Sequence, residues 1–206
     1  MYFLAIEWLP EEEDYENCLA NGYSEDNCQN HVTLLEESKS DHVMVCGTNA
    51  GRPLCRIYLA ETTDSGLEFR LQEKLPGSEI ISRSTKWSLE TIYEAKSKHL
   101  YVAKELENHR ASLVRYSYGT KRADFLRNHE KTFSSYGPIR FVKMIDHMEH
   151  IFIFFIERNR DGTDVSRVAT VCKNDLGGSQ NILSDRFTTF VKTTLECPVS
   201  EEFAFR

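Results

Sequence analysis

The most constraining feature of the sequence is the segment Asp41–Tyr58, DHVMVCGTNAGRPLCRIY. An apolar run, Val43–Cys46, is followed by a connection rich in Gly, Asn and Pro, and a second run begins at Leu54. This pattern predicts a strand, a turn-forming connection and a returning strand. Cys46 and Cys55 would then lie across the neck of a hairpin, where a disulfide can form.

Short strand-like segments recur along the rest of the chain, with turn signals about every 8–12 residues and little helix. This organisation predicts an all-β fold, either a sandwich or a propeller. His99–Glu107 is an alternative short helix, and Phe187–Leu195 combines helical spacing with a Thr-rich, strand-like composition. Ile151–Ile156 is continuously apolar, which predicts a central strand covered on both faces. The other predicted strands are Tyr2–Trp8, Val32–Leu35, Leu54–Ala60, Leu67–Leu71, Leu89–Glu94, Leu100–Ala103, Ser112–Tyr116, Ile139–Ile145 and Val165–Cys172.

The six cysteines fall into three sequential pairs, Cys18/Cys28, Cys46/Cys55 and Cys172/Cys197. The first two pairs enclose nine and eight residues, which suits local disulfides and an oxidising compartment. Six reduced thiols in a cytosolic protein are the alternative. No C-x-x-C occurs and no His pair completes a zinc-finger spacing, so the sequence predicts no metal and no cofactor.

Charge and motifs argue against nucleic-acid binding and catalysis. The net charge of −7 lacks the basic surface that phosphate attraction requires. Basic residues between Lys104 and Lys131 alternate with acidic ones, which we interpret as a mixed surface and not as a basic patch. The His147–His150 segment has neither H-E-x-x-H spacing nor a third ligand, and no nucleophile elbow is present. The chain is therefore not expected to be an enzyme.

Three blocks of sequence carry a resemblance to a known family. They are Ile6–Trp8 with Cys18, Leu19 and Ser24–Asn30; Val43–Arg56; and Ser166–Asp175 with Gly177, Gly178 and Phe187–Cys197. In this order and spacing they resemble the sema domain of semaphorins, whose early blade reads roughly L-V-C-G-T-N-A…P-x-C-R. The resemblance implies a partial seven-bladed β-propeller of about three blades. Residues 1–206 would be its N-terminal portion, incomplete at both ends.

The resemblance also assigns individual residues. It implies the disulfides Cys18–Cys28 and Cys46–Cys55, and partners beyond the chain for Cys172 and Cys197. The segment from Asn128 to Phe133 resembles the family's Q-H-D-S-K-W segment near the receptor-contact edge, with Glu for Asp and Phe for Trp. His129, Lys131 and Phe133 are thus the expected receptor contacts.

By the same resemblance, the chain is expected to come from an extracellular guidance ligand that binds a plexin receptor, with a homodimer formed by the full-length parent. Met1–Ile6 is too short for a signal peptide, so we expect a fragment of a secreted or membrane-anchored protein. The sequence contains no run of about 18 apolar residues, so it predicts no membrane span. The alternatives are the sema domain of a plexin or related receptor, which the Lys173–Asp175 and Phe187–Cys197 blocks disfavour, and a truncated product without a signalling role.

Overall fold

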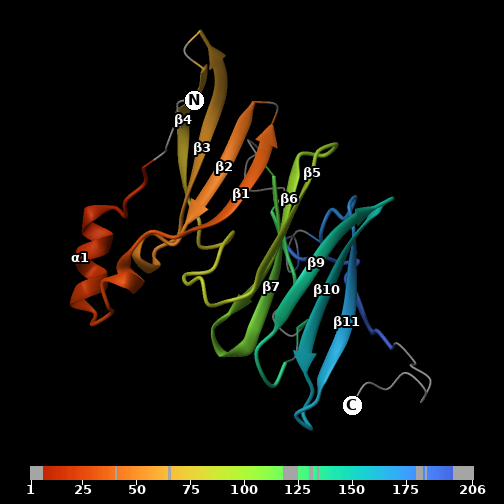
Figure 1. Cartoon of the computed structure of the whole chain (residues 1–206). Helices are drawn as coiled ribbons and strands as arrows, with labels where there is room; N and C mark the ends of the chain where they lie inside the picture. Colours follow the sequence, from red (N-terminus) through yellow and green to blue (C-terminus); the bar gives the residue numbers. More distant parts are fainter. Residues whose placement is uncertain are drawn as a thin grey trace, which may run out of the picture.

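The computed structural model describes residues 7–39, 41–64, 66–117, 125–129, 132–133, 135–179, 183 and 185–196. Within these residues the chain is almost entirely β-structure, with one short α-helix (Figure 1). The helical elements are α1 (Glu12–Ala20), η1 (Asp26–Cys28), η2 (Asn49–Gly51) and η3 (Glu107–His109). The strands are β1 (Val32–Lys39), β2 (His42–Gly47), β3 (Leu54–Thr63), β4 (Gly66–Pro76), β5 (Leu89–Glu94), β6 (His99–Leu106), β7 (Arg110–Ser117), β8 (Leu126–Arg127), β9 (Arg140–His147), β10 (His150–Arg158), β11 (Asp164–Cys172) and β12 (Val191–Thr194).

The strands form three four-stranded antiparallel meanders, β1-β2-β3-β4, β5-β6-β7-β8 and β9-β10-β11-β12. The sheets stand side by side in sequence order, like neighbouring blades (Figure 1). Successive sheets are linked near their first strands: Thr91 of β5 donates a hydrogen bond to Glu36 of β1 (2.6 Å), and the amide of Phe141 in β9 donates to Ser88, the residue before β5 (2.8 Å). The expected all-β fold is confirmed, and each sheet corresponds to one blade.

Hydrophobic side chains are buried between successive sheets. Leu34, Met44, Cys46, Cys55, Ile57, Ile80, Ile81, Leu100 and Val102 form the cluster between the first and second sheets. Tyr101, Leu113, Phe133, Phe141, Ile151, Ile153, Phe155 and Val171 belong to the larger cluster between the second and third. In β10, Ile151, Ile153 and Phe155 are buried whereas Phe152, Phe154 and Ile156 are half-buried. The prediction of a central strand is confirmed, since β10 pairs with both β9 and β11. The prediction that it is covered on both faces is wrong for the described residues, because its side chains alternate between a buried and a half-buried face.

The hairpin predicted from Val43–Tyr58 is present, since β2 pairs with β3 and Cys46 lies directly opposite Cys55. The structure contains a Cys46–Cys55 disulfide with 4.0 Å between the two Cα atoms. It also contains a Cys18–Cys28 disulfide with 5.7 Å between the Cα atoms. This second bond joins α1 to η1, so the segment between the two cysteines is partly helical.

The start of α1 explains the acidic run near the N-terminus. Glu12, Glu13 and Asp14 occupy the first helical turn. Negative charge there interacts favourably with the positive end of the helix dipole. The run is therefore part of a helix, an element that the predicted all-β pattern did not include.

Two ambiguous segments are resolved by the structure. His99–Leu106 is strand β6, so the short-helix alternative is wrong. The segment from Phe187 is strand only over Val191–Thr194, while Phe187 and Phe190 pack into the core. Of the predicted strand Tyr2–Trp8, only Glu7 and Trp8 lie among the described residues, and neither is in a strand.

The described residues contain no helix with the length and apolar character needed to cross a membrane. Among the same residues, no three His, Cys, Asp or Glu side chains are grouped so that they can hold a metal ion.

Candidate binding surface

The connections between strands gather at the two ends of the sheets, and one end carries both connections that lead from one sheet to the next. Because every sheet is an antiparallel meander, residues 48–53, 77–88 and 107–109 lie at the same end as the described residues of the connection after β8, 128–129, 132–133 and 135–139. We call this the connector end. Long connections on a rigid sheet scaffold are the usual place for recognition residues, and this end contains the segment that resembles the family's receptor-contact region.

The connection after β8 is anchored before it reaches His129. Asn128 is 4 % exposed, its side-chain oxygen accepts a hydrogen bond from the Leu113 amide (2.6 Å), and its own amide donates to the Leu113 carbonyl (3.0 Å). The carbonyl of His129 accepts hydrogen bonds from Thr132 and from the Asn128 side chain, both at 2.9 Å. His129 itself is exposed. Its backbone is therefore fixed while its ring faces outward.

The other two expected contact residues have different outcomes. Lys131 lies outside the described residues. Phe133 is 4 % exposed, and its ring packs edge-on against Phe141, Phe155 and Phe190 with centroid distances of 5.8, 5.3 and 5.5 Å. The assignment of Phe133 as a receptor contact is therefore wrong. Its ring is part of the hydrophobic cluster between the second and third sheets, and it anchors the connection there.

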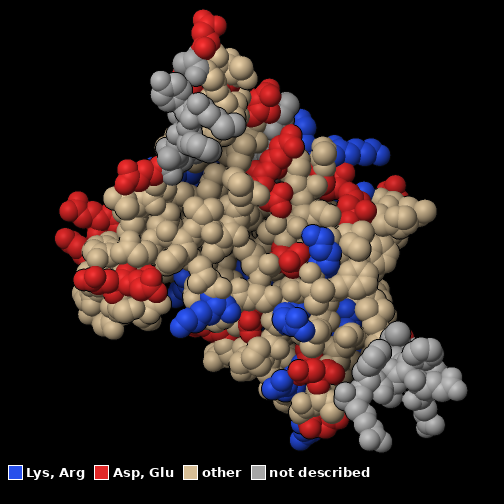
Figure 2. Space-filling model, viewed as in Figure 1, with Lys and Arg blue, Asp and Glu red and all other residues tan. Residues whose placement is uncertain are grey.

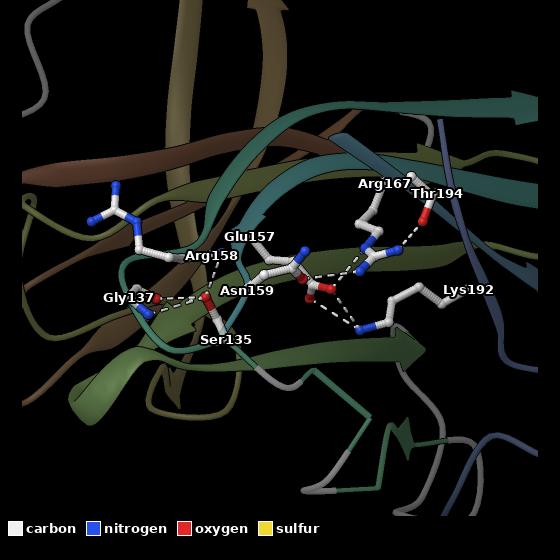
Figure 3. A network of polar contacts seen from close by, with 8 residues as sticks. All are labelled: Ser135, Gly137, Glu157, Arg158, Asn159, Arg167, Lys192 and Thr194. Carbon is white, nitrogen blue, oxygen red and sulfur yellow. Dashed lines mark hydrogen bonds and ion pairs between the residues drawn. The ribbon is translucent and has the colours of Figure 1, made fainter. Parts of the chain in front are cut away.

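A network of polar contacts lies beside residues 135–137 of the connection after β8 (Figure 3). Glu157, with a side chain only 3 % exposed, forms ion pairs with Arg167 (2.9 Å) and Lys192 (3.0 Å). One residue along β10, the amide of Arg158 donates a hydrogen bond to the Ser135 hydroxyl at 3.0 Å. The Ser135 hydroxyl in turn donates to the Gly137 carbonyl at 2.7 Å, so residues 135–137 are held against the end of β10, next to the paired carboxylate of Glu157.

Glu105 ties together the starts of two blades. One carboxylate oxygen accepts a hydrogen bond from the Ser88 amide and the other from the Ile139 amide, both at 3.3 Å. Ser88 precedes β5 and Ile139 precedes β9. His109 lies 3.9 Å from the same carboxylate. A single residue of β6 thus sets the spacing of two connections at the connector end.

Lys104 is buried and not part of a charged surface, which corrects the interpretation of the stretch between Lys104 and Lys131. It is 3 % exposed, and its amine donates hydrogen bonds to the carbonyls of Ser78 (2.6 Å) and Ile81 (3.2 Å). Burial lowers the pKa of the Lys104 amine to about 8, partly opposed by the charge of Glu79. The alternation of charges along the sequence does not indicate that Lys104 and Glu105, which are neighbours on β6, are buried on opposite faces of the sheet.

At the opposite end of the sheets, Asp175 organises the connection between β11 and β12. Burial alone would raise the pKa of the Asp175 carboxyl, but hydrogen bonds from Thr189, Gly177 and Thr188 outweigh it and lower the pKa. Arg115 of β7 donates to the Asp175 carbonyl at 2.7 Å. The Lys173–Asp175 block of the resemblance is therefore a structural tie between the second and third blades.

Of the two cysteines whose partners are predicted to lie beyond the chain, only Cys172 is among the described residues. Cys172, at the end of β11, is a half-buried free thiol. Cys197 lies outside the described residues. Partners beyond the chain for these two cysteines stay a prediction.

Comparison with known proteins identifies the family. The chain is 31% identical over 206 residues to Semaphorin-6D of Pongo abelii. It superposes on Drosophila Semaphorin 1b, extracellular domains 1-2, with a TM-score of 0.78 and 25% identity over 96% of its length. The chain is a homologue of the semaphorin sema domain. A chain in the solved structure of Drosophila Plexin A in complex with Semaphorin 1b matches with a TM-score of 0.74 and 25% identity. No family model matches the chain.

The homology covers nearly all of this chain but only part of each relative. The match spans 97% of the chain and 19% of Semaphorin-6D, and 37% of the Semaphorin 1b and complex chains. The resemblance drawn from the cysteine hairpin and the downstream blocks is thus confirmed at the level of the sema domain. Semaphorins are a signalling family without enzymatic activity, which agrees with the lack of a catalytic motif in the sequence.

Proposed function

We propose that this sema-domain homologue is part of an extracellular semaphorin-type guidance ligand that binds a plexin receptor through the connector end of its blades. The observation that carries the proposal is the match to the complex named for Plexin A and Semaphorin 1b, which extends over 96% of this chain. Two disulfides fit an oxidising, extracellular location.

His129 is the residue we assign to the receptor contact. It is exposed on a connection whose backbone is held by Asn128 and, through Phe133, by the core. A pre-organised loop loses little conformational freedom on binding, which favours affinity. Lys131 is assigned to the same contact from the sequence resemblance alone.

The test measures binding of the secreted chain to a plexin ectodomain by surface plasmon resonance. His129→Glu is expected to weaken binding by at least about tenfold, the effect of a loss of about 1.4 kcal/mol. The matched control is His147→Glu, because His147 is also exposed but is the last residue of β9, beside the turn to β10 at the other end of the sheets. Equal binding by both variants would remove His129 from the contact.

The same experiment, repeated with a semaphorin ectodomain as the second partner, separates the alternatives. A chain that binds a semaphorin and not a plexin would belong to a receptor, and a folded chain that binds neither would support a product without a signalling role. We also propose that the full-length parent forms a homodimer, which would present two plexin-binding sites at once and increase avidity. Sedimentation of the parent ectodomain tests this point.

A further inference from the structure

A groove of about 670 Å³ opens at the connector end between the N-terminal disulfide unit and residues 83–87. The walls differ in chemistry. The first is polar, with Asn17, Asn27 and Asp26, and the second contains Arg83, Lys86 and Trp87. Two further hollows of about 340 and 370 Å³ also border Trp87, so its half-buried indole lies at the junction of all three. We call this region the Trp87 groove.

The charges of the Trp87 groove are balanced. Asp14 and Arg52 pair with each other across 2.7 Å. The other charged lining residues are two cations and two carboxylates, Arg83 and Lys86 against Asp26 and Glu107. On the face shown in Figure 2, acidic side chains are also conspicuous over α1. An anionic ligand would therefore meet carboxylates as well as cations.

The balance of donors and acceptors narrows the ligand class. Asn side chains both donate and accept hydrogen bonds, Arg and Lys donate, and carboxylates accept. An apolar ligand would desolvate all of these groups without compensation. A peptide is bound mainly through its backbone or through apolar side-chain pockets, whereas this groove presents side-chain amides and charges around two aromatic side chains, Tyr23 and Trp87. Sugar hydroxyls both donate and accept, and a pyranose ring has an apolar face that can lie on an aromatic ring.

We propose that the Trp87 groove binds a neutral oligosaccharide. A pyranose ring packs on the indole of Trp87, while hydroxyl groups bond to the amides of Asn17 and Asn27 and to the charged side chains of the opposite wall. The volume of about 670 Å³ is within the range of sites that enclose a small organic ligand. The saccharide is either free or attached to a glycoprotein, and this inference does not depend on plexin binding.

The chain contains two tryptophans, which provides a direct optical test. Trp8 stacks on Arg56 at 4.3 Å and does not line the groove, so Trp8→Phe leaves Trp87 as the only reporter. The probe is the high-mannose glycan released from ribonuclease B. We expect it to change the fluorescence of Trp8→Phe and not that of the matched Trp87→Phe variant. Intact ribonuclease B and unglycosylated ribonuclease A then distinguish a glycoprotein-borne saccharide from protein binding.

A second variant keeps the test valid if replacement of Trp87 impairs folding. In Trp8→Phe, the added changes Asn17→Ala and Asn27→Ala are expected to weaken binding of the glycan about tenfold, since two hydrogen bonds are lost. Thermal unfolding checks that each variant is folded. The proposal is overturned if neither the free glycan nor ribonuclease B binds at millimolar concentration. Binding of a heparin tetrasaccharide alone would identify an anion site instead, and equal binding of ribonucleases A and B would identify a protein surface.

Discussion

The interface between the first and second sheets and the interface between the second and third are held together by different means. The first buries nine hydrophobic residues, two of which, Cys46 and Cys55, are joined covalently. The second buries fifteen hydrophobic residues and contains a cluster of phenylalanines around Phe133. The smaller interface therefore depends more on a constraint within one hairpin, and the larger one on non-covalent packing.

Polar contacts follow the same division. At the first interface, Lys104 donates hydrogen bonds to two backbone carbonyls in the segment that carries Ile80 and Ile81, and no carboxylate among the described residues pairs with its amine. At the second, Glu157 is paired with two cations at one end, and Arg115 bonds the Asp175 connection at the other. The buried charge of Lys104 is thus less compensated than that of Glu157.

The largest effect is expected from Phe155→Ala. Phe155 is 1 % exposed and packs at the centre of the second interface, so its removal should lower the free energy of unfolding by about 4 kcal/mol. Denaturant unfolding measures this loss. Phe152→Ala is the matched control, since Phe152 lies half-buried on the other face of the same strand and should cost less than half as much. Equal losses would mean that both faces of β10 are packed alike.

Loss of one disulfide should lower the global stability, whereas loss of the other should affect only the local structure around α1. Replacing Cys46 and Cys55 together by Ala should lower global stability by about 2.5 kcal/mol, because the loop is short and both sulfurs lie in the first interface. The Cys18–Cys28 bond lies in a separate small cluster with Ala50. Replacing it should open α1 locally and leave the global transition nearly unchanged. Hydrogen exchange combined with denaturant unfolding distinguishes the two, and identical exchange patterns would contradict the comparison.

Local sequence patterns were enough to predict most of the fold. Gly, Pro and Asn signals separate the strands, and the alternation of apolar and charged residues in Leu67–Leu71 identifies one of them. The facing positions of Cys46 and Cys55 follow from the length of their connection. These features are short-range, so they do not require knowledge of which sheets meet.

Burial at the candidate site could not be predicted in the same way. Phe133 stands in a polar segment, and its core position depends on the connection folding back over Phe141 and Phe155 from another sheet. Lys104 and Glu105 are adjacent and charged, a pattern that normally marks a surface. Their burial results from residues 77–88 and 139 closing over them, which is a long-range contact without a local signal.

The pH dependence of stability tests whether the buried charge of Lys104 is poorly compensated. The pKa of Lys104 is lowered from 10.5 to about 8 by burial, so above pH 8 the unfolded chain binds more protons than the folded chain. Stability should therefore rise with pH, by about 2 kcal/mol between pH 7.5 and 9.5, from this group alone.

Lys104→Met should abolish that rise, whereas Lys96→Met, at an exposed position, should retain it. The pKa of Tyr101 is raised to about 12, again chiefly by burial, and that group loses stability only above pH 10, outside the measured window. A rise that persists in Lys104→Met would assign it to another group. Thermal unfolding at each pH provides the measurement.

The smallest effect is expected in the outer half of the β3–β4 hairpin, which belongs to neither interface. Arg70 and Glu61 form an ion pair at 3.2 Å with side chains 65% and 46% exposed, and pairs of this kind contribute about 0–1 kcal/mol. Glu61 also lies directly opposite Glu68, a like-charge pair that offsets part of the gain. Glu61→Gln should thus change the free energy of unfolding by less than about 0.5 kcal/mol in a denaturant titration. A loss above about 1 kcal/mol would show that the outer hairpin unfolds cooperatively with the first interface, and the division between the two interfaces would then have to be redrawn.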